Sequence, residues 1–115
     1  MPPLLVCVPS PLLGPAVWGP VERVLRRRGW STSVVAAPAP VSTGQDVLAG
    51  LLAALPVDQQ LVLVAHSNAG AYVPALVSAR PVVAAVFVDA VLPQRTGGPV
   101  PLAPAAFLGH LRAKA

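Results

Sequence analysis

The stretch LVLVAHSNAG, residues 61–70, decides how the rest of the chain is interpreted. Its first five residues are apolar without alternation, which predicts a buried strand over residues 61–65. The next three, His-Ser-Asn, are polar, and apolar residues at helical spacing follow them over residues 69–79. The stretch therefore predicts a sharp turn from a strand into a helix, with three polar side chains at the turn.

Short apolar runs and amphipathic segments alternate on both sides of this turn. Pro20 fits a helix only within its first turn, where its missing N–H has no partner to lose. Ser42-Thr43-Gly44-Gln45 has the spacing of a capping box, and Pro74 is expected to kink the helix that contains it. The patterns predict strands over residues 4–8, 32–37, 61–65 and 82–88, and helices over residues 14–28, 47–55 and 69–79.

These elements follow the order strand, helix, strand, helix, strand, helix, strand. Strands that are apolar throughout need cover on both faces, which favours a parallel sheet between two helical layers. We therefore expect an α/β fold, a three-layer sandwich with a mainly parallel four-stranded sheet. Residues 1–93 would form this core. Residues 94–115 are rich in Pro and Gly, and they predict a loop followed by a short helix over residues 105–113, or a tail.

Composition excludes several other classes of protein. The chain has 115 residues and 11.7 kDa, which fits one domain. It is 55% hydrophobic and 10% charged, with mean hydropathy +0.69, which excludes charge-driven disorder and a coiled coil. The single Cys7 excludes a disulfide scaffold and a cysteine-based zinc site. We expect neither a metal nor a cofactor.

Targeting signals and basic patches give no sign of a membrane or nucleic-acid partner. Prolines interrupt the uncharged residues 1–19, no basic region precedes them, and residues 82–92 are too few to span a bilayer. We therefore expect a cytoplasmic protein.

The net charge is +4, and half of the basic residues gather at one helix end, where they favour the helix dipole and face solvent: Arg23, Arg26, Arg27 and Arg28. No aromatic residues interleave with these arginines.

Ser67 is the candidate for chemistry. A serine hydroxyl is a poor nucleophile until a base takes its proton. A sharp strand-to-helix turn can lift such a serine above a sheet and direct backbone N–H groups at the same point, provided its neighbours are small. Here Ala65 and Ala69 occupy the two small positions, and Gly70 follows. The alternative is that Ser67 or Asn68 caps the helix, since both residue types are favoured there.

With this turn in the chain, the sequence resembles the N-terminal half of an α/β-hydrolase. LLVCVPSPLLGP (residues 4–15), with Trp18 and VERVLRRRG (residues 21–29), resembles the first core strand, oxyanion loop and first helix of that family. LVLVAHSNAG resembles its nucleophile elbow, and VFVDAVLP (residues 86–93) resembles the strand after the elbow helix. The match covers residues 4–93. It implies the strand order 2-1-3-4, with Ser67 and the loop after the first strand meeting at the switch point.

The resemblance also implies roles for individual residues. Ser67 would be the nucleophile, and the Asn68 N–H would be one donor of the oxyanion hole. The family takes its second donor from the loop after the first strand. That loop usually contains His-Gly, whereas Pro9-Ser10 stands here, and Pro11 has no N–H. Leu12 is then the nearest residue that could donate.

An acid and a base complete the expected constellation. Asp89, at the end of the fourth strand, could serve as the acid, or it is a structural carboxylate that caps a loop. His110 would complete the order Ser…Asp…His, or it is a surface histidine. His66 is expected to pack beside the turn without acting as the base. The later strands that usually carry the acid and base of the family have no counterpart in residues 1–115.

Three functions follow from this pattern. The chain could be a serine hydrolase that acts on a small ester or amide through an acyl-enzyme on Ser67. It could instead be a non-catalytic, truncated hydrolase-like module, in which the exposed fourth strand pairs with another chain, including a second copy. A third reading is a site for a small anion at the start of the helix after Ser67.

Overall fold

The computed structural model describes residues 2–36 and 43–93, and its sheet has four parallel strands. The strand order β2-β1-β3-β4 is the one expected. Since Val8 on β1 is in register with Ala65 on β3, the carboxyl ends of these two strands lie side by side. The strands are β1 (Leu4–Val8), β2 (Thr32–Val34), β3 (Leu61–Ser67) and β4 (Val82–Ala90).

Prolines set the boundaries of the helices. The helix expected over residues 14–28 is divided into a 3-10 helix, η1 (Pro15–Trp18), and an α-helix, α1 (Gly19–Arg27), with Pro20 in the first turn as expected. The expectation that Pro74 kinks a helix was wrong. A 3-10 helix, η2 (Asn68–Tyr72), follows β3, and Pro74 lies in the first turn of α3 (Val73–Ala79), where it breaks no hydrogen bond.

Helix α2 (Gly44–Ala54) begins before residue 47, where the helical spacing predicted it, and its capping box starts at Thr43, one residue after the expected Ser42. The Thr43 hydroxyl accepts a hydrogen bond from Asp46 N at 3.1 Å, and Thr43 N donates to Asp46 Oδ2 at 3.1 Å. Thr43 is therefore the cap, with Asp46 as its partner, because this pair satisfies donors on both sides of the helix start.

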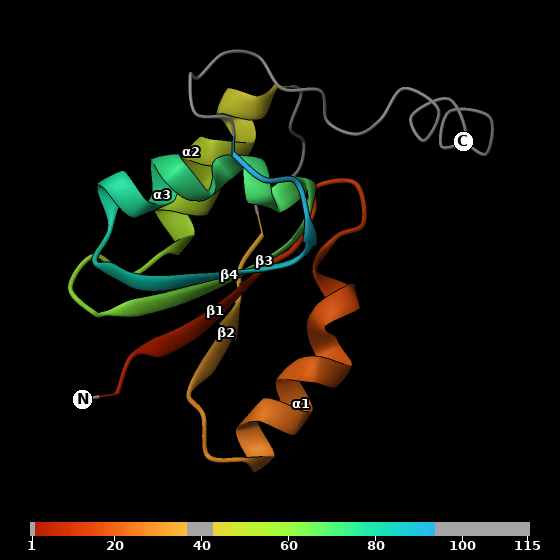
Figure 1. Ribbon diagram of the computed structural model, residues 1–115, viewed down its shortest axis with the longest axis vertical. Coiled ribbons are helices and arrows are strands. Elements are labelled where there is room, and N and C mark those ends of the chain that lie inside the picture. The colour runs from red at the N-terminus through yellow and green to blue at the C-terminus, as the bar shows by residue number, and fades with distance from the viewer. Residues whose placement is uncertain (1, 37–42, 94–115) are drawn as a thin grey trace.

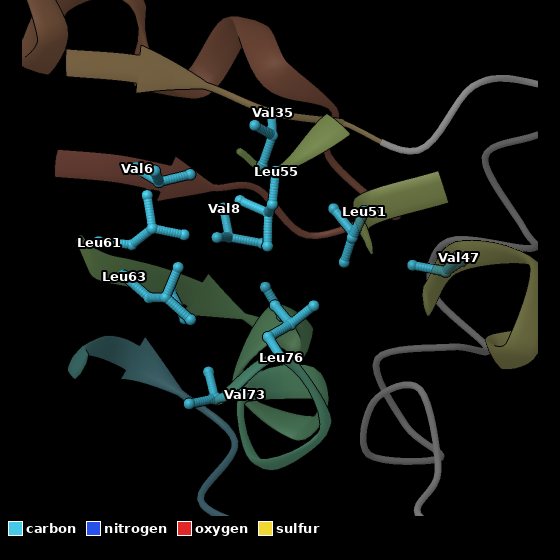
Figure 2. Packing of buried hydrophobic residues seen from close by; sticks show 12 residues of the cluster. Val6, Val8, Val35, Val47, Leu51, Leu55, Leu61, Leu63, Val73 and Leu76 are labelled. Carbon is cyan, nitrogen blue, oxygen red and sulfur yellow. The ribbon is translucent and has the colours of Figure 1, made fainter. Parts of the chain in front are cut away.

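Three layers result, with α2 and α3 on one face of the sheet and α1 on the other (Figure 1). The buried core lies on the α2 and α3 side, where alternate residues of β1 and β3 meet both helices. Figure 2 shows Val6, Leu61 and Leu63 of the strands facing Val73 and Leu76 of α3. The α/β three-layer class expected from the sequence is confirmed.

The opposite face of the sheet is covered less completely. Trp18 at the end of η1 is buried against it, but α1 itself buries no residue, and Val17, Val21 and Val24 stay exposed. Gly29, with φ +90°, reverses the chain after α1 as expected for a residue behind the last turn. No helix in residues 2–36 and 43–93 has the length and apolarity needed to cross a membrane.

Three strands differ in length from their expected spans. β3 runs two residues longer than expected, to Ser67. β2 has three residues, and it ends where Val35 leaves the ladder with one further hydrogen bond to Cys7 O. β4 runs two residues longer than expected, to Ala90, through an irregularity beside Ser67. The sequence patterns therefore located these three strands but not their ends.

Candidate active site

The candidate site lies at the carboxyl ends of β1 and β3, where the strand order reverses direction. Ligands of open α/β sheets bind outside this point, because the loops of the two neighbouring strands diverge to opposite faces. The register of Val8 with Ala65 brings the loop that starts at Pro9 beside the turn that starts at His66. The structure thus brings Ser67, Asn68 and the Leu12 loop to one edge of the sheet.

Ser67 has the backbone conformation of a strained turn. Its φ is 56° and its ψ is −127°, in a region that non-glycine residues rarely adopt and that occurs at functional sites. Ser67 is the residue before η2, yet its side chain makes no capping hydrogen bond to that helix. The half-buried hydroxyl makes no hydrogen bond to any described residue. The capping alternative therefore does not account for Ser67.

Small residues make the turn after Ser67 sterically feasible. Ala69 is fully buried, and a Cβ added to Gly70 would overlap the carbonyl oxygen of Val91. That carbonyl belongs to the segment that crosses behind the turn, where Val91 N donates to Ser67 O at 2.9 Å. The close approach of this segment to η2 therefore requires glycine at position 70.

The loop after β1 is closed around Ser10, which is fully buried. Leu12 N donates to Ser10 Oγ at 3.1 Å, and the amides of Leu13 and Gly14 donate to the Ser10 carbonyl at 3.1 and 2.9 Å. Leu12 lies in the expected loop, but its N–H already has an acceptor. An oxyanion at this site would compete with Ser10 Oγ for that hydrogen.

Asp89 lies at the irregularity between β3 and β4. Ser67 is in register with Ala90 and His66 with Val88, so Asp89 is the extra residue of the longer strand. Its φ of 44° is in the left-handed region, which Asp tolerates better than most residues. The side chain is exposed and makes no hydrogen bond or ion pair within residues 2–36 and 43–93. Asp89 therefore caps no loop in the described part of the chain.

His66 packs on the α1 side of the sheet. Its ring meets the indole of Trp18 edge to face, with centroids 6.1 Å apart and planes at 83°. Both rings line a cavity of about 170 Å³ with Val17, Val21 and Val88. The His66 imidazole is therefore packed against Trp18 on the α1 side of the sheet. A larger cavity, about 420 Å³, lies beside Pro2 and residues 58–60 at the amino ends of the strands, whereas Ser67 lies at the carboxyl end of β3.

Two further expectations concern the base and an anion site. His110, the candidate base, and the helix expected over residues 105–113 lie outside the described residues. Within those residues His66 is the single histidine, and no cluster of three or more His, Cys, Asp or Glu side chains could hold a metal.

The helix after Ser67 starts as a five-residue 3-10 helix, whose short dipole is a weak basis for an anion site.

Two features of the site were missed by the sequence analysis. The first is the Ser10 hydroxyl as an acceptor within its own loop, for which the sequence carried only a weak signal, since Ser at the start of a turn often bonds backbone two residues on. The second is the steric requirement at Gly70. A glycine directly after Ala69 at a strand-to-helix turn could have indicated it.

Comparison with solved structures places this arrangement in a known fold. A histidine-to-alanine mutant of polyneuridine aldehyde esterase matches with TM-score 0.66 and 21% identity, over 83% of this chain and 43% of its own. A histidine-to-alanine variant of tomato methylketone synthase I, complexed with β-ketoheptanoate, matches with TM-score 0.62 and 18% identity, over 100% of this chain and 48% of its own. No family model and no curated protein matches the sequence.

Fold and site together define a three-layer α/β protein with a serine at the switch point of its parallel sheet. Both matched structures are α/β-hydrolases, and the chain has the α/β-hydrolase fold. It spans less than half the length of either matched chain. The fold resemblance drawn from the sequence is therefore confirmed.

Proposed function

We propose that the chain is a serine hydrolase of the esterase type, which acts on a small ester or amide through an acyl-enzyme on Ser67. The observation that carries the proposal is the backbone of Ser67, with φ 56° and a side chain that makes no capping hydrogen bond. A strained conformation at a non-glycine residue costs of the order of 1–3 kcal/mol, and such strain clusters at functional sites.

The reaction would begin with attack of Ser67 Oγ on the carbonyl carbon of the substrate, while a base removes the hydroxyl proton. The carbonyl oxygen then becomes an oxyanion, stabilised by the backbone N–H groups of Asn68 and Leu12. The base returns its proton to the departing alcohol or amine. Water, deprotonated by the same base, attacks the acyl group and regenerates the Ser67 hydroxyl. A single donor of an oxyanion hole contributes about 10²–10³ in rate.

Of the two proposed oxyanion-hole donors, the Leu12 N–H is the one that already donates to another acceptor, Ser10 Oγ. Its hydrogen bond to Ser10 Oγ, at 3.1 Å, must lengthen or become shared as the oxyanion forms. The adjacent amides of Leu13 and Gly14 are bound to the Ser10 carbonyl and hold the loop in place. In this proposal the loop is preorganised. Its contribution to the rate depends on how easily the hydrogen bond from Leu12 N–H to Ser10 Oγ is replaced by one to the oxyanion.

His110 is the proposed base and Asp89 the proposed acid. Asp89 is exposed and without a hydrogen bond to the described chain, so its carboxylate is available to an imidazole. Because His66 packs against Trp18, a base must come from elsewhere. A serine that lacks a base keeps about 10³–10⁴ of acceleration over water from the oxyanion hole and substrate binding.

A fluorophosphonate probe tests the nucleophile directly. We expect the wild-type protein to be labelled on Ser67, Ser67→Ala to abolish labelling, and Ser78→Ala to leave it unchanged. Ser78 is a matched control because its hydroxyl is on α3 and already donates to Pro74 O at 3.1 Å. Folded wild-type protein that stays unlabelled would rule the proposal out.

The base is tested by turnover of a p-nitrophenyl ester. His110→Ala is expected to lower the rate by about 10²–10⁴, the usual contribution of a general base. His66→Ala serves as the comparison and is expected to act through stability alone. Labelling of Ser67 with no effect of His110→Ala would retain the nucleophile and reject His110.

The second candidate is a non-catalytic hydrolase-like module that pairs with another chain. It is favoured by one observation, that the single imidazole among the described residues, that of His66, packs against the Trp18 indole. Under this alternative the probe would leave the folded protein unlabelled.

A further inference from the structure

The loop between β1 and η1 directs three of its backbone amides to a single residue, Ser10. Leu12 N donates to the Ser10 hydroxyl oxygen at 3.1 Å. Leu13 N and Gly14 N donate to the Ser10 carbonyl oxygen at 3.1 and 2.9 Å. Pro11, which lies between them and Ser10, has no N–H to offer. An oxyanion that uses this loop must therefore take its hydrogen from a bond that already exists.

The bend of this loop is set by the main chain rather than by the Ser10 hydroxyl. Gly14, with φ +80° and ψ 173°, adopts a conformation that favours glycine. Pro11 and Pro15 disfavour helical backbone at the residues before them, which restricts both sides of the turn. Two of the three amide hydrogen bonds go to the Ser10 carbonyl and do not involve its side chain. Removal of the hydroxyl would therefore release one amide and leave the loop in place.

The Ser10 hydroxyl can act on the site through Leu12, not through the substrate. Ser10 is fully buried, so its hydroxyl is out of reach of a substrate. Leu12 is half-buried. The register of Val8 with Ala65 brings this loop beside the turn that contains Ser67. The hydroxyl is therefore placed to influence the reaction by what it does to the Leu12 N–H.

We infer that Ser10 is a positioning residue that keeps the Leu12 N–H from the neutral carbonyl of the substrate and releases it to the oxyanion; this inference rests on the proposed function. A neutral ester carbonyl forms a hydrogen bond similar to the one with Ser10 Oγ, so it gains nothing by displacing the hydroxyl. Hydrogen bonds to a charged oxygen are about twice as strong as neutral ones, so the oxyanion does displace it. The Leu12 hydrogen bond then forms only in the transition state, where it lowers the barrier of the chemical step.

Turnover of a p-nitrophenyl ester by Ser10→Ala tests this inference. Without the hydroxyl, the Leu12 N–H can bind the substrate carbonyl as well as the oxyanion. We expect kcat/KM to rise about two- to tenfold, the contribution of one neutral hydrogen bond. The rise should come from a lower KM, with kcat within about twofold of wild type. A merely structural role would instead lower kcat, because the loop would be displaced. Ser78→Ala, which removes a hydroxyl on α3, is the matched control and should change neither constant.

The Leu12 amide proton gives a second readout, which does not depend on turnover. Labelling of Ser67 by a fluorophosphonate places a phosphonyl oxygen where the oxyanion would form. We expect the Leu12 amide resonance to shift on labelling of the wild-type protein, because its acceptor changes from Ser10 Oγ to that oxygen. If Ser10→Ala does not fold, Ser10→Gly, which also removes the hydroxyl, replaces it.

Failure of this inference and failure of the hydrolase proposal give different results. If Ser67 is labelled, a lower kcat or an unchanged kcat/KM in Ser10→Ala overturns the inference and retains the nucleophile. A Leu12 resonance that labelling leaves in place also overturns it. Folded wild-type protein that the probe leaves unlabelled rejects the hydrolase proposal, and the role of Ser10 is rejected with it.

Discussion

Gly70 is the residue at which the turn after Ser67 is most sensitive to substitution. A Cβ at this position would overlap the backbone oxygen of Val91, which a change of rotamer cannot move. We expect Gly70→Ala to lower the free energy of unfolding by about 2–4 kcal/mol, because overpacking against backbone forces main-chain shifts. Chemical denaturation followed by circular dichroism would measure this change.

Gly44→Ala is the control for Gly70→Ala. A Cβ at Gly44, the first residue of α2, would lie 3.5 Å from the Tyr72 hydroxyl, an ordinary contact. We expect this change to be neutral or to stabilise the protein by about 0.5–1 kcal/mol, as alanine does relative to glycine in a helix. A Gly70→Ala protein as stable as wild type would contradict the close approach of Val91.

Cys7 couples stability to pH in the alkaline range. Burial raises the pKa of the Cys7 thiol from 9.0 to about 11, with a smaller contribution from the nearby Glu22 carboxylate. Above pH 9 the unfolded chain therefore loses its thiol proton while the folded chain keeps it. Stability from this group is complete below pH 9 and decreases as the pH rises to about 11, by on the order of 2 kcal/mol.

Cys7→Ala isolates this effect. Wild type and variant should differ in how their free energies of unfolding change between pH 8 and pH 11, with the steeper decline in wild type. Tyr72, whose pKa burial also raises above 10.0, contributes equally to both proteins and cancels in the comparison. Parallel slopes for the two proteins would show that the thiol titrates normally in the folded state.

The positions of the strands were predicted well, because the local pattern of residue types is enough to locate them. Continuous apolar runs located β1, β3 and β4, of which only β1 and β3 bury residues, whereas β2 was located from its β-branched and apolar residues. Proline effects were harder to predict. Pro20 and Pro74 both lie in the first turn of an α-helix. For Pro74 the sequence did not show this, because the 3-10 helix η2 comes between Ser67 and the start of α3.

The candidate site was predictable in part for the same reason. Small neighbours and a strand-to-helix transition marked Ser67 from local sequence alone. The hydrogen bond from Leu12 to Ser10, and the extra residue that displaces Asp89 from the β3–β4 ladder, depend on how loops from two strands settle against each other. No pattern of residue types encodes that geometry, because it follows from tertiary contacts rather than from local preference.

Stability across the whole molecule should be unequal on the two faces of the sheet. α2 buries Val47 and Leu51 in the core and has a capping box, and Arg80 donates to Leu52 O at 2.6 Å near the end of α2. α1 buries no residue, and its outer turn is held by Arg26, which pairs with Glu22 and donates to Thr32 Oγ1 at 3.0 Å. An exposed ion pair of this kind contributes less than about 1 kcal/mol.

Amide hydrogen exchange under native conditions measures this difference. We expect amides of α1 to exchange through local opening, about 10²-fold or more faster than those of β3, after correction for intrinsic rates. Amides of α2 should exchange about as slowly as those of β3. The reason is that α2 buries residues in the core, whereas α1, which is also short, buries none. Equal protection of α1 and β3 would mean that α1 unfolds only with the whole domain, and that its face is covered by contacts beyond those of residues 2–36 and 43–93.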